Sequence, residues 1–223
     1  MAKQFEAVIF DLDGTLLDTL ADLAAAANRM LDSNGYPTHP IDAFRHFVGD
    51  GAKMLVHRIL PQAVRSKETE KRCLISFLDD YRQHWHDRTC PYPGIVDMLD
   101  ALTTRHIRLA VLSNKPHDMT VHCIEHFFSQ WAFDSILGQR PDVPKKPDPA
   151  GAMETARCMD LPPSTYIFVG DTSIDMKTAR AAGMFAMGVR WGFRPADELQ
   201  SGGAHILIDR PLDMIAHLDR RGC

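Results

Sequence analysis

The sequence predicts an α/β protein whose core is a doubly wound parallel sheet. First, short apolar runs each end in a polar turn, as buried parallel strands do. Second, helical patterns lie between these runs, and strands that alternate with helices form parallel sheets. Third, residues 17–88 show helical patterns without a convincing strand. Together these observations predict a Rossmann-like core with a small α-helical segment inserted after the first strand.

Three apolar runs carry the strand pattern clearly and three carry it more weakly. The clear strands are residues 6–10, 107–112 and 165–169, and the weaker ones are residues 135–137, 186–189 and 205–208. Polar residues follow the clear runs directly, beginning at Asp11, Ser113 and Gly170. Because ligands of doubly wound sheets bind beyond the carboxyl ends of the strands, these polar turns are where we expect a functional site.

Helical patterns fill the intervals between the strands. In the core we expect helices over residues 94–105, 117–128, 149–159 and 173–182, and in the insert over residues 21–31, 42–47, 52–60 and 68–85. Gly183 suits a C-terminal helix cap. Pro91-Tyr92-Pro93-Gly94 marks the return to the α/β pattern. We therefore expect a core of residues 1–16 and 89–223 and a helical domain of residues 17–88.

Composition excludes several classes of function. The net charge is −4, from 25 basic and 29 acidic side chains, whereas nucleic-acid binding requires a basic surface. No apolar run reaches the length of about 18 residues that spans a membrane, and no signal peptide precedes the first strand pattern. The five cysteines lack the spacing of a zinc site or a disulfide framework. We expect a cytoplasmic protein with reduced thiols and no membrane or nucleic-acid partner.

Acidic residues follow two of the clear strands. Asp11 and Asp13 come after the first, and Gly14 lets the backbone approach an anion closely. Asp171 follows the third, and Asp175 falls in the first turn of the next helix. Carboxylates from separate strands can converge on one hard cation such as Mg²⁺. Taken singly, these residues also fit a solvated turn and a favourable charge at a helix N-terminus.

Ser113, Asn114 and Lys146 are suited to contact an anion. A hydroxyl and an amide at a helix N-terminus suit a phosphate group, although both also suit ordinary helix capping. Lys146 lies in Lys-Lys-Pro-Asp-Pro, where Pro147 restricts the backbone and Pro149 can open a helix. A lysine held in this way offers a fixed positive charge to a phosphoryl group, although lysine pairs in loops are usually solvated.

In their order along the chain, these four elements resemble the four motifs of the haloacid dehalogenase superfamily. They are Asp-Leu-Asp-Gly-Thr at 11–15, the strand that ends at Ser113, Lys146 with its Lys-Pro-Asp-Pro sequence, and Gly-Asp-Thr-Ser-Ile-Asp at 170–175. The resemblance runs from Phe5 to about Val189. It implies a Mg²⁺-dependent phosphatase that acts on a small phosphorylated metabolite.

The resemblance also implies a role for each matching residue. Asp11 would be the nucleophile that forms an aspartyl-phosphate, and Asp13 would protonate the leaving alkoxide and then activate water. Lys146 would neutralise Asp11 and the phosphate. The residues implied for Mg²⁺ are Asp11, Asp13 through its backbone carbonyl, Asp171, and Asp175 directly or through water. Those implied for the phosphoryl group are Gly14, Ser113 and Asn114. Dehalogenases of this superfamily generally lack the second aspartate, so Asp13 favours phosphoryl chemistry.

The helical segment resembles the small α-helical cap of this family, which closes over the site and recognises the leaving group. Within it, Gly49, Asp50 and Gly51 precede a helix with Lys53 in its first turn, and resemble a segment of phosphoglycolate phosphatases. The two glycine amides and Lys53 would suit a glycolate carboxylate, whereas Asp50, where Asn is usual, would repel it. Trp191-Gly192-Phe193 resembles another segment of these phosphatases and would lie near the site entrance. An interhelical turn and a packed aromatic turn are the alternatives.

We expect 2-phosphoglycolate as the substrate, and five other functions stay open. A pyrophosphatase or a sugar-phosphate phosphatase would use the same chemistry. A phosphoryl-transfer mutase of this fold would pass the phosphate to a sugar. A phosphonate hydrolase would need a lysine in the cap for a Schiff base, for which Lys53 is the candidate. A non-catalytic binding module would lack Asp11, Asp13 or Asp171, and all three are present.

Overall fold

The computed structural model describes residues 5–221, and the chain forms two compact units. The sheet unit joins the chain up to Leu17 with the chain from Pro91 onward, and the helical unit is Asp18–Cys90. Two short strands, β2 (Leu17–Asp18) and β3 (Cys90–Pro91), pair where the chain passes between the units. Over residues 5–221 we find no helix with the length and apolar character that a membrane span requires.

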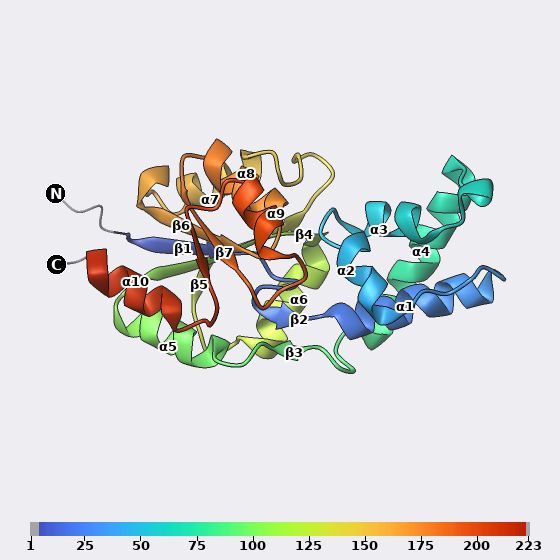
Figure 1. The fold of residues 1–223 in the computed structure, drawn as a ribbon, viewed down its shortest axis with the longest axis horizontal. Coiled ribbons are helices and arrows are strands. Elements are labelled where there is room, and N and C mark those ends of the chain that lie inside the picture. The colour runs from blue at the N-terminus through green and yellow to red at the C-terminus, as the bar shows by residue number, and fades with distance from the viewer. Residues whose placement is uncertain (1–4, 222–223) are drawn as a thin grey trace. The chain divides into compact units, whose positions relative to one another are not determined.

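The sheet unit is built on six parallel strands in the order β5-β4-β1-β6-β7-β8 (Figure 1). The strands are β1 (Ala7–Phe10), β4 (Arg108–Pro116), β5 (Phe133–Gln139), β6 (Tyr166–Gly170), β7 (Phe185–Val189) and β8 (Ile206–Ile208). The predicted parallel sheet is confirmed, and each of the six apolar runs contributes a strand. Every residue of β1, β6 and β7 is buried, which explains why these strands appear in the sequence as continuous apolar runs.

Helices cover both faces of this sheet. They are α5 (Ile95–Thr104), α6 (His117–Phe127), α7 (Ala150–Cys158), the short 3-10 turn η3 (Pro163–Thr165), α8 (Ser173–Ala181), α9 (Ala196–Ser201) and α10 (Asp213–Arg221). In Figure 1, α7, α8 and α9 lie on one side of the sheet and α5, α6 and α10 on the other. Small side chains such as Ala152 of α7 and Ala179 of α8 belong to the same buried cluster as Ile9 and Phe168 of the sheet.

The backbone of β4 stays in the sheet beyond the end of its apolar pattern. The pattern predicts a strand over residues 107–112, but β4 continues to Pro116, which lies opposite Gln139 after an irregularity in the register. Ser113 and Asn114 therefore lie in the last part of a strand and not in a helix N-terminus, since α6 begins only at His117. The apolar pattern stops early because residues at the carboxyl end of a parallel strand can serve a ligand site instead of the core.

The helical unit is formed by α1 (Leu20–Ser33), η1 (Ile41–Ala43), α2 (Phe44–Phe47), α3 (Ala52–Ile59), η2 (Gln62–Val64) and α4 (Lys67–His84). Helices α1 and α4 pack together, and Arg29 of α1 donates to Asp80 of α4 at 2.9 Å and 2.6 Å. Helix α4 begins after Ser66, whose hydroxyl accepts a hydrogen bond from the Thr69 N–H, a common N-cap arrangement.

A buried carboxylate joins the first and last segments of the helical unit. Oδ2 of Asp22, in α1, accepts hydrogen bonds from the Arg88 N–H at 2.9 Å, the Thr89 N–H at 2.8 Å and the Thr89 hydroxyl at 2.8 Å. Asp22 and Thr89 are both buried, so these bonds compensate the loss of water around the charge.

We expect Asp22→Ala to lower the free energy of unfolding by about 2–4 kcal/mol, because it removes a charged acceptor and leaves the buried N–H and hydroxyl of Thr89 without this partner. Urea denaturation of the wild type and the variant measures this difference. Asp32→Ala, at an exposed position of the same helix, is the matched control and should change stability by less than about 0.5 kcal/mol. Equal losses in the two variants would show that the hydrogen bonds of Asp22 do not stabilise the unit.

Candidate active site

The candidate site lies at the carboxyl ends of β4, β1 and β6, which are neighbours in the sheet. Asp11 follows β1, and its N–H donates to the Val169 carbonyl of β6 at 2.9 Å, so strand pairing fixes its position. Asp171 follows β6, and Asp175 lies in the first turn of α8. Lys146 comes from the loop between β5 and α7. Residues far apart in the sequence therefore meet because their strands end at the same edge of the sheet.

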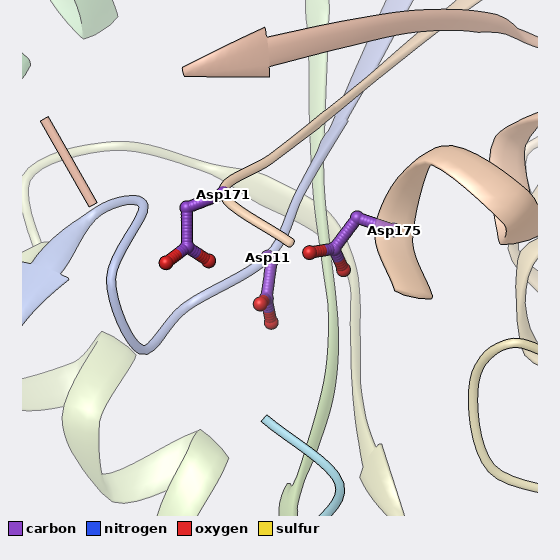
Figure 2. Close-up of side chains that lie close together, drawn as sticks. All are labelled: Asp11, Asp171 and Asp175. Carbon is purple, nitrogen blue, oxygen red and sulfur yellow. The ribbon is translucent and has the colours of Figure 1, made fainter. Parts of the chain in front are cut away.

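Three carboxylates converge at this edge (Figure 2). Asp11, Asp171 and Asp175 are buried, and one oxygen from each lies within 4.8 Å of the others. Burial and then the charge of Asp175 raise the pKa of Asp11 to about 7. Burial, followed by the charges of Asp175 and Asp11, raises the pKa of Asp171 well above its ordinary value. The cluster therefore requires positive charge if all three groups are to be ionised at neutral pH.

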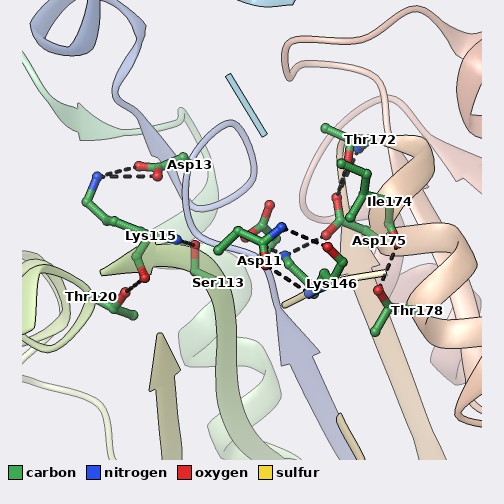
Figure 3. Close-up of polar contacts among 11 residues, drawn as sticks. Asp11, Asp13, Ser113, Lys115, Thr120, Lys146, Thr172, Ile174, Asp175 and Thr178 are labelled. Atoms are coloured by element: carbon green, nitrogen blue, oxygen red, sulfur yellow. Dashed lines mark hydrogen bonds and ion pairs between the residues drawn. The ribbon is translucent and has the colours of Figure 1, made fainter. Parts of the chain in front are cut away.

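Lys146 supplies one of these positive charges. Its ammonium group lies 2.8 Å from Oδ1 of Asp11 and 2.6 Å from Oδ1 of Asp175 (Figure 3). Burial lowers the pKa of Lys146, but the two neighbouring carboxylates outweigh burial and raise it, so the side chain stays charged. Against three ionised carboxylates, one ammonium leaves two negative charges uncompensated. A divalent cation would balance that remainder.

The chemistry of the cluster fits such a cation. Oδ2 of Asp171 accepts a hydrogen bond from the Phe193 N–H at 2.7 Å. Its Oδ1 is buried and has no hydrogen-bond partner within residues 5–221. Buried polar atoms are nearly always satisfied, so a buried carboxylate oxygen of this cluster that has no donor among the described residues is suited to a metal ligand. Carboxylate oxygens are the ligands that Mg²⁺ prefers, and they are the groups that would hold it here.

Asp175 has a structural role together with its place in the cluster. Its Oδ2 accepts hydrogen bonds from the Thr172 N–H at 3.1 Å and the Thr172 hydroxyl at 2.7 Å. The Thr172 side-chain oxygen in turn accepts from the Asp175 N–H, which completes a capping box at the start of α8. Oδ1 of Asp175 accepts from Lys146. Gly170 permits this arrangement, because a Cβ there would lie 2.3 Å from Cβ of Asp175. Asp175 can therefore stabilise the start of α8 and belong to the carboxylate cluster at the same time.

Asn114 holds the backbone of Lys146. Its Nδ2 donates to the Lys146 carbonyl at 3.1 Å, and its Oδ1 accepts from the Lys146 N–H at 2.9 Å. The Ser113 hydroxyl accepts a hydrogen bond from the Lys115 N–H at 3.3 Å. Both residues are buried beside the cluster, and their contact with a phosphoryl group stays a prediction.

The side chain of Asp13 lies outside the carboxylate cluster and forms an ion pair with Lys115. Nζ of Lys115 lies 2.9 Å from Oδ1 of Asp13 and 3.3 Å from Oδ2 (Figure 3). The Lys115 side chain is 3% exposed and the Asp13 side chain 19% exposed. The predicted metal contact of Asp13, through its backbone carbonyl, stays a prediction.

Lys115 was not among the predicted site residues, although the sequence carries a signal for it. Side chains two apart on an extended strand point to the same side, so the predicted role of Ser113 also directs Lys115 toward the site. Because the predicted strand ends at residue 112, Ser113 and Lys115 fall outside it, and the prediction does not place their side chains on the same side of a strand.

The predicted glycines lie in two different settings. Gly14 has a φ of 88°, and a Cβ there would lie 2.3 Å from Oδ2 of Asp171, so the site requires glycine. Gly49 and Gly51 belong to the helical unit with φ values of 110° and 83°, and α3 begins after Gly51. Lys53 lies in the first turn of α3.

Asp50, between the two glycines of the helical unit, has a charge partner. The guanidinium of Arg58 pairs with its Oδ2 and also donates to the Phe47 carbonyl at 3.0 Å. The positive charge of Arg58 therefore compensates the negative charge of the Asp50 carboxylate.

Comparisons with known proteins extend over most of the chain. A family model described as haloacid dehalogenase-like hydrolase matches residues 8–189. A phosphoglycolate phosphatase of Pseudomonas putida is 34% identical over 206 residues, which are 91% of this chain and 75% of that protein. One of Chromobacterium violaceum is 34% identical over 211 residues, 93% of each. The crystal structure of a candidate phosphoglycolate phosphatase from Lactobacillus delbrueckii subsp. bulgaricus has a TM-score of 0.90 and 30% identity, over 96% of this chain and 98% of that one.

Proposed function

This chain belongs to the haloacid dehalogenase-like hydrolase family and is a phosphatase, and we propose that it hydrolyses 2-phosphoglycolate with Mg²⁺ through an aspartyl-phosphate on Asp11. One observation carries the proposal: Asp11 lies against Lys146 within a buried cluster of carboxylates at the edge of the sheet where ligands bind. We expect the reaction to take place in the cytoplasm on a small phosphorylated metabolite.

In the first step, a carboxylate oxygen of Asp11 attacks phosphorus and the bond to the leaving oxygen breaks, while Asp13 donates a proton to that oxygen. An anion that attacks an anionic phosphate meets charge repulsion, which Lys146 offsets. Mg²⁺, held by Asp11, Asp171 and Asp175, would supply further positive charge toward the phosphoryl oxygens. Asn114 contributes indirectly, since it fixes the backbone that carries Lys146.

In the second step, Asp13 accepts a proton from water while the water oxygen attacks phosphorus. The bond between phosphorus and Asp11 breaks, which releases inorganic phosphate and restores the carboxylate. The same group serves as acid and then as base because the first step leaves it deprotonated. Two covalent steps replace one difficult hydrolysis.

The choice of 2-phosphoglycolate rests on the relatives that carry this name and on the helical unit. The carboxylate of this substrate suits the amides of Gly49 and Gly51 and the charge of Lys53. Asp50 would oppose that binding if its charge were uncompensated, but Arg58 pairs with it. We propose that residues 17–88 act as the cap that recognises the leaving group.

Phosphate release in the presence of Mg²⁺ tests this proposal on a panel of 2-phosphoglycolate, pyrophosphate, sugar phosphates and phosphonoacetaldehyde. We expect a strong preference for 2-phosphoglycolate that chelation of Mg²⁺ abolishes. A preference for another member of the panel would show that 2-phosphoglycolate is not the substrate, and would leave the proposed reaction through Asp11 standing. Turnover that survives chelation would overturn the role of the metal.

We expect Lys115→Met to lower kcat on 2-phosphoglycolate by about 10- to 100-fold, because the Asp13 side chain would lose the contact that restrains it and would be less well placed for its two proton transfers. Steady-state kinetics measure the effect, and Lys115→Arg, which keeps the charge, should restore part of it. Lys177→Met, at an exposed position of α8, is the matched control and should keep the wild-type kcat. An unchanged kcat in Lys115→Met would exclude a role for the ion pair in catalysis.

A further inference from the structure

The segment from Trp191 to Gly202, which follows β7 and includes α9, contacts the carboxylate cluster although the mechanism uses none of its side chains. We call it the 191–202 segment. The N–H of Phe193 donates to Oδ2 of Asp171 at 2.7 Å. This bond occupies one oxygen of Asp171, while Oδ1 is buried and lacks a partner within residues 5–221. The Phe193 amide thus occupies Oδ2 of Asp171, and Oδ1 is the oxygen that is left to bind a cation.

Gly192 packs directly against the same carboxylate. A Cβ at this position would lie 2.2 Å from Cβ of Asp171, 2.6 Å from its Oδ2 and 2.5 Å from the Gly14 carbonyl oxygen. Real Cβ atoms essentially never approach so closely, and neither the backbone of Gly14 nor Cβ of Asp171 is the far end of a flexible side chain. Gly14 encloses Asp171 from another direction, since a Cβ there would lie 2.3 Å from Oδ2. Any side chain at residue 192 would therefore displace Asp171.

The segment is also anchored to the start of α8, two residues beyond Asp171. Oε1 of Glu198 accepts hydrogen bonds from the Ser173 hydroxyl at 3.0 Å and the Ser173 N–H at 3.3 Å. Nε of Arg194 lies 3.3 Å from Oε2 of Glu198. A Cβ on Gly202 would lie 2.8 Å from Cα of Ser173, so the end of α9 packs closely on the same residue. The segment therefore contacts Asp171 itself and also Ser173, which lies two residues after Asp171 in α8.

The Trp191 side chain extends the contact to the first motif. Its Nε1 donates to the Thr15 carbonyl at 3.0 Å, next to Gly14 in the loop that follows Asp11. The segment therefore binds two of the loops that carry the carboxylates.

We propose that the 191–202 segment is a positioning element, which holds Asp171 so that Oδ1 points toward a divalent cation. The proposal rests on the metal role of Asp171 in the proposed function. It assigns the Trp-Gly-Phe sequence a role in metal affinity and not only at the site entrance. Groups that orient a metal ligand typically change metal affinity by about 10- to 100-fold when they are altered.

The test measures Mg²⁺ affinity from the rise in the thermal unfolding midpoint across a Mg²⁺ series, without substrate. We expect Gly192→Ala to raise the half-saturating Mg²⁺ concentration at least 10-fold. Gly151→Ala is the matched control, because its Cβ would meet the flexible side chain of Leu112 in β4 and neither Asp171 nor the 191–202 segment. It should leave the half-saturating concentration at the wild-type value.

Glu198→Ala and Asp197→Ala decide the question if Gly192→Ala does not fold. Both remove one negative charge from the first turn of α9, but only Glu198 accepts hydrogen bonds from Ser173. Weaker Mg²⁺ binding in Glu198→Ala alone supports the proposal. Wild-type affinity in Gly192→Ala, or in Glu198→Ala where that variant decides, would overturn the positioning role alone. A wild type without a saturable response to Mg²⁺ would overturn the metal in the proposed function and the positioning role with it.

Discussion

Asp11→Asn will abolish phosphate release, with an expected loss on the order of 10⁴-fold or more. An amide oxygen is a poor nucleophile, so the covalent step fails even if the substrate binds. Phosphate release from 2-phosphoglycolate at saturating Mg²⁺ measures the loss. Asp97→Asn, at an exposed position in the first turn of α5, is the matched control and should keep the wild-type rate. Turnover of more than about 1% in Asp11→Asn would exclude Asp11 as the nucleophile.

The same substitution should not destabilise the protein in the absence of metal. Asp11 is close to Asp171 and Asp175, and its raised pKa of about 7 reflects burial and the charge of Asp175. Ionisation of Asp11 therefore costs stability increasingly as the pH rises from the unfolded pKa toward 7, and the full cost is present at pH 8. The uncharged amide removes that cost while Lys146 keeps its contact with Asp175. Urea denaturation at pH 8 in a chelator should give a free energy of unfolding at least equal to that of the wild type. A marked loss of stability there would mean that the inactivity reflects a damaged fold.

The convergence of the acidic residues was predictable because parallel strands end at one edge of a sheet. Asp11 and Asp171 directly follow apolar runs, and the order of β1 and β6 makes these runs neighbours. The sheet and its carboxylate cluster thus follow from patterns of only a few residues each. The separation of Asp13 from the cluster was not predictable, since it depends on the direction of one side chain toward Lys115.

Gly14 and Gly192 are both predicted near the site, but their close packing on Asp171 was not predictable because it depends on contacts between distant segments. Gly192 and Gly14 are 178 residues apart in the printed numbering, and only the folded chain places both against Asp171. Helices α9 and α10 have no counterpart among the predicted helices, and α9 has only six residues, which leaves too few turns for a periodic pattern. The predicted strand of residues 107–112 ends too early, because the run of apolar side chains stops before the backbone leaves the sheet at Pro116.

Lys146→Met will cause the largest loss of stability that we expect from a single substitution in the site. Methionine has a similar length but no charge, so Asp11 and Asp175 lose the ammonium that lies 2.8 Å and 2.6 Å from them. Removal of one partner from a buried ion pair typically costs about 3–5 kcal/mol, because the remaining charge is left uncompensated. Urea denaturation in a chelator at pH 8 measures this cost. Lys177→Met, at an exposed position of α8, is the matched control and should change stability by less than about 0.5 kcal/mol.

The dependence of this loss on pH separates a charge effect from a packing effect. Asp11 already has a raised pKa in the wild type, and without Lys146 its protonated form is favoured further. A carboxylate with a raised folded-state pKa destabilises the protein increasingly as the pH rises above the unfolded value, so the deficit of Lys146→Met should be largest above pH 7 and should shrink toward pH 5. A deficit independent of pH would point to lost packing of the lysine side chain against Phe168, whose ring centre lies 5.7 Å from Nζ. We also expect kcat to fall by about 10³-fold or more, because the attack of Asp11 on an anionic phosphate would lose its nearest positive charge.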